Sequence, residues 1–355
     1  MYLRAAKICD KLKTRKNLRQ DILSIFAFRK SERHWHIPIL AGLSVGIPLF
    51  LGYIFDNLSN GILASTSGLL ILYISFTAVA NRMVSLMVCS FIFILSYFVG
   101  AIGSFNIWLA PLILCVYVFL LNLIIRYFKF KAPGNFFFIL IVSLAICQDF
   151  DLSSIPERVG VVTLGTISTC TLAFIYSMCT MKNYTLANER IVFEKAKRID
   201  AGESAILGLF VGGALLIATF FKLDNPYWVP VSCAAVMQGA TRRHIWERSI
   251  NRVVGTFIGA GLAWFLLDLE MTGLAICITI VLLQFIVEVV VVRQYAVAVI
   301  FITALTIFLA EGSHDISQNA DQSIYIRFFD IFLGCIIGAV GGWILYNNKV
   351  RAKLQ

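Results

Sequence analysis

Long apolar runs alternate with short polar segments along almost the whole chain. Many of these runs approach about 17 to 25 residues, the length that an α-helix needs to cross a hydrocarbon core about 30 Å thick. A helix satisfies its backbone hydrogen bonds internally, so the pattern predicts transmembrane helices. We place twelve spans at approximately 37–54, 61–79, 83–100, 106–125, 134–148, 159–180, 204–221, 226–240, 253–268, 271–292, 295–311 and 324–346.

The basic residues in the polar segments predict the orientation of these spans. If the N-terminus is cytoplasmic, every Lys and Arg except Arg158, Lys222 and Arg327 falls on the cytoplasmic side. Cytoplasmic loops carry an excess of Lys and Arg, and the opposite orientation would violate this rule. We therefore expect a multi-pass protein of the bacterial inner membrane with both termini in the cytoplasm.

The chain also repeats itself at an offset of 167 to 169 residues. Six spans per copy is an even number, so both copies enter the membrane in the same direction, as in parallel repeats. The sequence thus predicts an all-α integral membrane protein built from two parallel six-helix repeats, a pseudo-dimer. The matching pairs are Asp56-Asn57 with Asp224-Asn225, Arg126 with Arg293, and RVGVVTLG at 158–165 with RFFDIFLG at 327–334.

This repeat divides the chain into five predicted segments. A basic cytoplasmic arm, 1–36, precedes the first six-helix repeat, 37–180, and residues 22–28 within the arm are expected to form an amphipathic surface helix. A charged cytoplasmic linker, 181–203, leads to the second repeat, 204–346, and the chain ends in a cytoplasmic tail, 347–355.

Composition agrees with a membrane protein and argues against several other classes. Of the 355 residues, 59% are hydrophobic and 14% are charged, whereas soluble domains carry about 25% charged residues. The net charge of +10 follows from basic loops and does not call for a nucleic-acid partner. The nine cysteines form no CxxC pair and mostly lie in apolar runs, which indicates buried apolar side chains rather than disulfides or metal ligands.

One segment resembles a known family. The sequence NPYWVPVSCAAVMQG at 225–239, followed by Thr241 and RSINRVVGTFIGAG at 248–261, resembles the fusaric acid resistance-like family, the membrane module of bacterial aromatic acid exporters. The NRxxGTxxG core at 251–259 is also similar to the plant aluminium-activated malate transporters, which are dimeric six-span anion channels. The strong likeness covers roughly 203–270 and implies a pseudo-dimer that moves organic anions.

The glycines and arginines of 242–261 are the first candidates for function. Gly255 and Gly259, with Thr256 and Gly261, allow close helix packing in lipid, and we expect this packing at the interface between the two halves. The arginines either only fix the topology or gather organic anions at the cytoplasmic mouth. Arg252 is the best candidate for a direct contact, because its guanidinium fork matches a carboxylate. The arginines are Arg242, Arg243, Arg248 and Arg252.

The start of the eighth span offers a second set of candidates. We expect Asn225 to cap this helix and Pro226 to occupy its first turn. Tyr227 and Trp228 are then either aromatic anchors at headgroup depth or stacking partners for an aromatic substrate. Pro230 interrupts a backbone hydrogen bond that Ser232 could replace, and freed carbonyls or Gln238 are candidates to line a polar path.

Ionisable residues within spans are few and suggest coupling or a pathway. Glu288, on the same face as Gln284, either takes up a proton during transport or pairs with Arg293. Asp330 follows Arg327 by three residues, so we expect these two to pair on one helix face. Arg158 occupies the place equivalent to Arg327, with Val161 where the aspartate would be, so Arg158 and Arg327 either mark the outer end of the pathway or only snorkel to the interface.

Enzyme hypotheses find no support in the sequence. The four histidines have no metal-binding spacing, and neither a phosphate-binding loop nor a nucleophile elbow occurs, so no cofactor is expected. We expect a secondary exporter of small organic acids, with aromatic acids as one candidate class. The alternatives are a passive anion channel on the same pseudo-dimer and a non-transporting membrane scaffold, and further self-association stays open. Loss of activity in Glu288→Gln would indicate a proton-coupled exporter, whereas a retained conductance would indicate a channel.

Overall fold

The computed structural model describes residues 34–74, 79–128, 130, 133–180, 201–239, 241–269, 271–311 and 320–346. The side chains of Arg242, of residues 310–311 and of residues 320–326 are not described. Within the described residues the fold is all-helical. The predicted surface helix at 22–28, most of the linker and the tail lie outside these residues. The helices are α2 (His36–Ile54), α3 (Leu58–Thr66), the 3-10 helix η1 (Ser67–Tyr73), α4 (Val79–Gly103), α5 (Ala110–Tyr127), α6 (Phe136–Ile146), α7 (Ile155–Cys179), α8 (Ala201–Phe220), α9 (Trp228–Met237), α10 (Arg242–Leu267), α11 (Gly273–Val291), α12 (Tyr295–Glu311) and α13 (Ala320–Leu345).

Helix length separates these elements into two groups. Eight helices are long and apolar enough to cross a membrane, namely α2, α4, α5, α7, α8, α10, α11 and α13. Four apolar helices are shorter: Leu58–Tyr73, Phe136–Ile146, Trp228–Met237 and Tyr295–Leu309. Each predicted span thus coincides with a described helix, and the second coincides with α3 continued by η1.

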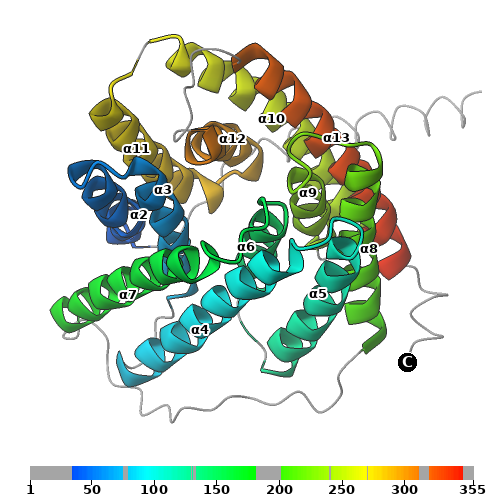
Figure 1. Cartoon of the computed structure of the whole chain (residues 1–355), viewed down its shortest axis with the longest axis horizontal. Helices are drawn as coiled ribbons and strands as arrows, with labels where there is room; N and C mark the ends of the chain where they lie inside the picture. The colour runs from blue at the N-terminus through cyan, green and yellow to red at the C-terminus, as the bar shows by residue number, and fades with distance from the viewer. Residues whose placement is uncertain are drawn as a thin grey trace, which may run out of the picture.

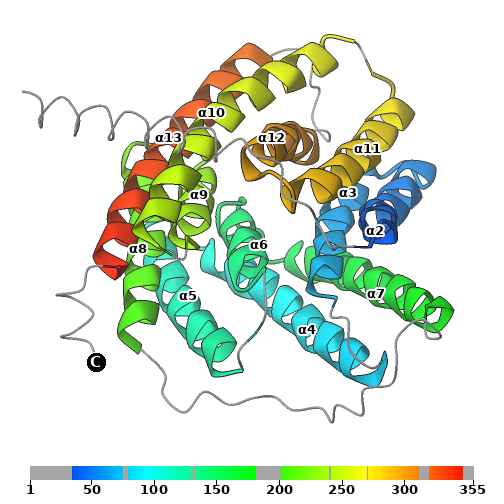
Figure 2. The ribbon, with the colours of Figure 1, turned by 180° about the vertical axis from the view of Figure 1, so that it is seen from behind.

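The long helices lie around the outside of the molecule. In Figures 1 and 2, α6, α9 and α12 lie inside a ring formed by α2, α4, α5, α7, α8, α10, α11 and α13. The ring presents large apolar side chains outward, as on α4, where Phe91, Leu95 and Phe98 are exposed at helical spacing. Apolar side chains that face outward at this spacing suit contact with lipid.

Helix α13 shows how the polar residues are distributed. Phe329, Phe332, Ile336, Val340 and Trp343 are exposed along one face, whereas Arg327, Asp330 and Gly334 on the other face are buried. The polar face of this helix is therefore turned into the protein, the opposite of a helix at the surface of a soluble protein.

Two close helix contacts join the first and second parts of the chain. A Cβ atom on Gly46 of α2 would lie 2.7 Å from a methyl carbon of Val281 on α11, and one on Gly212 of α8 would lie 2.6 Å from Cβ of Cys115 on α5. These pairs are among the extensively packed helices of the structure. Small residues let such helices approach closely where no hydrophobic effect drives association.

Candidate anion site

Arg252 lies inside the protein on the third helix of the second half, α10. Its side chain is 7% exposed, and its Nε donates a hydrogen bond of 3.3 Å to Oγ of Ser232 on α9. Among the described residues no acidic side chain forms an ion pair with it. Burial of a guanidinium costs several kcal/mol unless charge and hydrogen bonds compensate, so this arginine is suited to accept an anion.

Arg248 lies one turn before Arg252 and is half-buried. Its Nη1 donates to the Ala235 carbonyl at 3.0 Å and approaches Oε1 of Gln238 at 3.5 Å. The guanidinium also lies over the ring of Tyr295, with Cζ 5.1 Å from the ring centroid. Arg248 and Gln238 thus belong to one polar group at the C-terminal end of α9.

This group continues into the first half of the chain. Nε2 of Gln238 donates to the Pro133 carbonyl at 3.2 Å and approaches Oδ1 of Asn135 at 3.4 Å. Asn135 in turn donates to Asn122 at 2.9 Å, and Asn122 donates to Ser204 at 2.8 Å. Asn122, Asn135 and Ser204 were not among the predicted functional residues, although amides within apolar runs are a usable signal for such networks.

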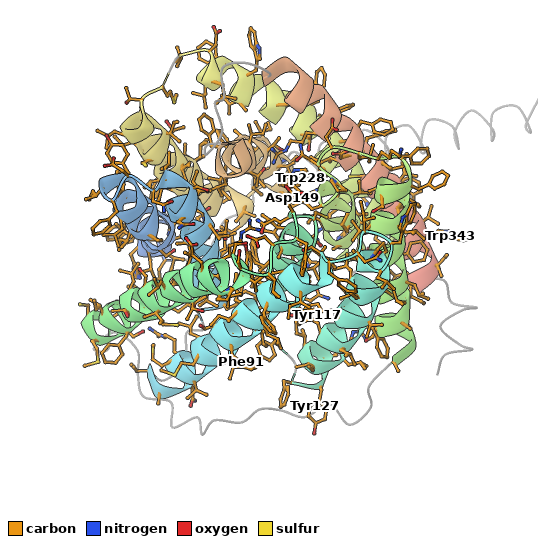
Figure 3. The ribbon with its side chains drawn as sticks, in the orientation of Figure 1. Phe91, Tyr117, Tyr127, Asp149, Trp228 and Trp343 are labelled. Atoms are coloured by element: carbon orange, nitrogen blue, oxygen red, sulfur yellow. The ribbon has the colours of Figure 1, made fainter. Side chains whose placement is uncertain are left out.

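Arg327 and Trp228 form a second buried cluster near the start of α13. Arg327 is 2% exposed and Trp228 is 5% exposed. The Arg327 Cζ lies 3.9 Å from the Trp228 ring centroid, and Nη2 donates to Oγ1 of Thr306 on α12 at 2.7 Å. Figure 3 shows Trp228 in the middle of the molecule, whereas Trp343 points outward from α13. The prediction that Trp228 anchors the protein at headgroup depth is therefore wrong, because the ring is used as a platform for Arg327.

Tyr227 is partly buried beside this cluster, with its ring centroid 4.8 Å from that of Trp228. The predicted cap also differs from the structure. Helix α9 begins at Trp228 after Tyr227, without a side-chain cap, so Asn225 and Pro226 lie before the helix rather than in its first turn. Ser232 accepts a hydrogen bond from Arg252 instead of replacing the backbone bond lost at Pro230.

Threonines connect the two arginine clusters along α10 and α12. Oγ1 of Thr306 accepts from Arg327, donates to the Ile302 carbonyl at 2.8 Å and lies 3.0 Å from the Thr303 carbonyl. Oγ1 of Thr303 lies 3.5 Å from Oγ1 of Thr256, one turn after Arg252. Hydroxyl groups three residues apart in the apolar run of α12 are the sequence signal for this connection. The second half therefore carries a series of polar side chains from the half-buried Arg248 through the buried Arg252 to the buried Arg327.

The predicted pairing of Asp330 with Arg327 is not formed. Asp330 is fully buried, and neither of its carboxylate oxygens has a hydrogen-bond partner among the described residues. The guanidinium of Arg327 is directed to Trp228 and Thr306 instead. On α11, Glu288 is 2% exposed beside Gln284 at 1%, whereas Arg293 is exposed.

The glycines of α10 pack against a helix of the same half. A Cβ on Gly255 would lie 2.8 Å from Cβ of Val299, and one on Gly259 would overlap the Ile300 carbonyl oxygen. Both neighbours are on α12, so the predicted location at the interface of the two halves is wrong. Nothing lies within 4 Å of a Cβ on Gly261, so that glycine is not a packing residue.

The remaining candidates lie outside this buried series. Arg243 is exposed and pairs with Glu247 at 2.7 Å, and the side chain of Arg242 is not among those described. Arg158 donates at 3.4 Å to Oε1 of Gln148 and to the Asp149 carbonyl. Hydrogen bonds from Ser153 lower the pKa of nearby Asp151, so that carboxyl stays ionised and partly balances Arg158, unlike the buried Arg252.

The described residues contain no group of three or more His, Cys, Asp or Glu side chains that could hold a metal ion. The eight described cysteines are all free. Arg248, Arg252, Ser232 and Gln238 bring guanidinium, hydroxyl and amide groups to the site, and guanidinium groups bind carboxylates and other anions.

Comparisons with known proteins agree with the resemblance in the second half. Residues 213–341 match the fusaric acid resistance protein-like family. A protein of Bacillus subtilis (strain 168) described as the uncharacterized membrane protein YvaC is 35% identical over 147 residues. That match covers 41% of this chain and only 23% of the longer relative. No solved structure matches the chain significantly. Together with the apolar helices, these likenesses indicate a multi-pass membrane protein whose residues 213–341 are similar to the fusaric acid resistance protein-like family.

Proposed function

Because residues 213–341 match the fusaric acid resistance protein-like family, we propose that the chain is a secondary transporter that exports small organic acids, including aromatic ones, from the bacterial cytoplasm. Both termini are cytoplasmic in this proposal, so the α9–α10 loop is on the inner side. The C-terminal end of α9 then faces inward and its N-terminal end faces outward.

The burial of Arg252 carries this proposal. Its charge lies 7% exposed with one neutral hydroxyl as partner, while Arg126 pairs with Glu203 and Arg243 pairs with Glu247. A desolvated guanidinium without a carboxylate leaves donors that an organic carboxylate can satisfy in a forked geometry. The same charge would repel organic cations, so the site favours anions.

The polar groups on either side of Arg252 outline the path that an anion would take. Arg248 and Gln238 lie toward the inner side of Arg252, and Thr256, Thr303 and Arg327 lie toward the outer side. An anion that leaves Arg252 toward the outer side would thus pass threonine hydroxyl groups and approach a further guanidinium. Such a series lowers the cost of moving a charge through low-dielectric protein.

We also propose that the two halves are related as a pseudo-dimer. The turns after α2 and α8 have the same hydrogen bonds at an offset of 166 residues, and both place a residue with positive φ at the matching position, Asp56 and Lys222. A Cβ on Gly165 of α7 would overlap the Ala64 carbonyl oxygen, as one on Gly334 of α13 would overlap that of Val229. Helix α2 packs on α11 and α8 packs on α5, which is the reciprocal exchange expected across a two-fold axis.

Flux of a permanently charged probe tests the transport proposal. Benzenesulfonate is suitable because it stays ionised and does not cross lipid as a neutral acid, and its sulfonate fits a guanidinium fork. Proteoliposomes containing the protein should take up or release it faster than empty liposomes. Arg252→Gln should lower the flux by about ten- to a hundredfold, since hydrogen bonds to charged groups contribute about 1.5–3 kcal/mol.

Ser232 and Ser67 offer a matched pair of variants for the same assay. Both hydroxyls are fully buried, but Ser232 accepts from Arg252 whereas Oγ of Ser67 has no partner. Ser232→Ala should lower the flux by a few-fold and Ser67→Ala should leave it unchanged. If the flux is equal for the wild type, for Arg252→Gln and for empty liposomes, the chain is not a transporter and the scaffold alternative is favoured. Steady single-channel currents in a planar bilayer would instead favour the passive anion channel.

A further inference from the structure

Asp330 is a buried carboxyl group whose hydrogen-bonding capacity is unused. Its side chain is 0% exposed, and both Oδ atoms lack a hydrogen-bond partner among the described residues. Buried carboxylates in proteins are normally hydrogen-bonded or paired, because an unpaired buried charge is costly. The internal hydrogen bonds of the protein therefore give no structural reason for a carboxyl group at this position.

The charged and titratable groups around Asp330 come from several elements. Arg327 is one turn earlier on α13, and Asp224, in the segment between α8 and α9, is the second charged group that acts on it. Cys335, on the same helix, lies within electrostatic range of Arg252 of α10 and of Cys233 of α9. Helix α12 contributes the neutral hydroxyl of Thr306, which is bonded to Arg327.

Asp330 lies between two points at which α13 touches the donor series. Arg327, one turn before it, stacks on Trp228. Gly334, one turn after it, lies against Ser232, where a Cβ would be 2.7 Å from Cβ of Ser232, and Ser232 is the partner of Arg252. A carboxyl group thus stands beside the part of the series that joins the Arg252 site to its outer end.

We infer that Asp330 is a proton-binding gate at the outer end of the anion path. Ionised Asp330 repels an anion that leaves Arg252, and a proton from the outer side removes that charge and lets the anion pass. The step adds one proton to a carboxylate oxygen and breaks no bond. This inference rests on the proposed anion transport and its orientation, and it assigns control of that transport to the acidity outside the cell.

Efflux from right-side-out membrane vesicles tests the gate. Vesicles from cells that produce the full chain are loaded with benzenesulfonate and buffered inside at a fixed pH, while the outer pH is lowered from about 8 to about 5.5. Efflux from vesicles with the wild-type protein, after subtraction of efflux from vesicles without it, should rise at least about tenfold. The reason is that, above the pKa of a carboxyl group, its protonated fraction grows tenfold for each unit by which the pH falls. Changing the inner pH at fixed outer pH should have little effect.

Three variants identify the responsible carboxyl group. Asp330→Asn should give fast efflux at both values of outer pH, and Asp330→Glu should restore the dependence. Asp151→Asn, which removes an exposed carboxylate from the loop before α7, should behave as wild type. Benzenesulfonate binding to each purified variant, measured by calorimetry in detergent, shows that it is folded.

Each other result overturns the inference. Asp330 would be excluded as the gate if efflux through Asp330→Asn kept the wild-type pH dependence, also in the case that Glu288→Gln loses it. A folded Asp330→Asn without efflux would exclude Asp330 as well. If Asp330→Asn does not fold, the wild-type protein still tests the gate. Wild-type efflux that depends on the inner pH, or that depends on neither the inner nor the outer pH, would exclude Asp330 as the gate. Absence of wild-type efflux at every pH would instead contradict the proposed function itself.

Discussion

The guanidinium of Arg327 lies over the indole ring of Trp228, with Cζ 3.9 Å from the ring centroid. This contact joins the start of α9 to the early part of α13, and Nη2 of the same guanidinium donates to Thr306 of α12. The stacked pair therefore explains why a tryptophan is buried at the end of a helix.

Trp228 should be far more important for stability than Trp343. Trp228 is 5% exposed and supports Arg327, whereas Trp343 is 49% exposed on the outer face of α13. We expect Trp228→Ala to lower the free energy of unfolding by about 3–5 kcal/mol, and Trp343→Ala to change it by about 0.5 kcal/mol. Thermal unfolding in detergent measures both, and equal effects would contradict the buried stacking.

Two glycines of α10 that are two residues apart should respond oppositely to alanine. A Cβ on Gly259 would overlap the Ile300 carbonyl oxygen of α12, whereas nothing lies within 4 Å of a Cβ on Gly261. Gly259→Ala should therefore cost about 1–3 kcal/mol through overpacking. Gly261→Ala should be neutral or stabilise the helix by up to about 1 kcal/mol. Denaturation in detergent compares the two, and a tolerated Gly259→Ala would show that α10 and α12 are less closely packed.

Alanine at Gly165 and at Gly334 should have similar costs if the halves are equivalent. Each glycine allows a carbonyl oxygen of the second helix of its half, from Ala64 or Val229, to approach. We expect each variant to lose about 1–3 kcal/mol, while Gly160→Ala, which has open space around the new Cβ, should lose nothing. Unfolding midpoints of the three proteins provide the comparison. A large cost at one glycine and none at the other would count against the pseudo-dimer.

Labelling of Cys179 checks the orientation of the chain. Cys179 is exposed at the end of α7, and Cys89, Cys233, Cys277 and Cys335 are buried. With Cys9 and the partly exposed Cys115, Cys147 and Cys170 replaced by serine, a membrane-impermeant maleimide should modify Cys179 in inside-out vesicles and leave it unmodified in intact cells. A second protein that carries Asp151→Cys, at the opposite end of α7, and serine at Cys179 should show the reverse pattern. Modification of Cys179 from outside would invert the proposed topology.

The sequence predicted the helices well because hydropathy depends only on local composition. The twelve predicted spans all coincide with described helices, since every apolar run must satisfy its backbone in the same way. Length was harder to judge, as for α9, which has 10 residues where a span was expected. The predicted span at 226–240 also included Pro226, Tyr227, Gln238 and Gly239, because hydropathy averaged along the chain does not separate a few turn residues from the apolar helix beside them.

Side-chain partners were predicted less well than helices. Spacing alone paired Asp330 with Arg327, but a ring from another helix competes for the guanidinium, and the choice of Trp228 depends on tertiary packing. The repeated Asp-Asn dipeptides were also misleading. Asn57 caps α3 through its side chain, whereas Asn225 does not cap α9, and the matching turns are instead found at Asp56 and Lys222. An identical dipeptide carries less information about register than a hydrogen-bonding pattern.

The short central helices have a consequence for the permeability barrier. Helices α6 and α9 pack together and have 11 and 10 residues, so each is about 15 Å long. The surrounding hydrocarbon is about 30 Å thick. At the centre of the molecule these two helices consequently supply only about half of the thickness over which ions have to be excluded, and the loops and side chains beyond their ends have to supply the rest.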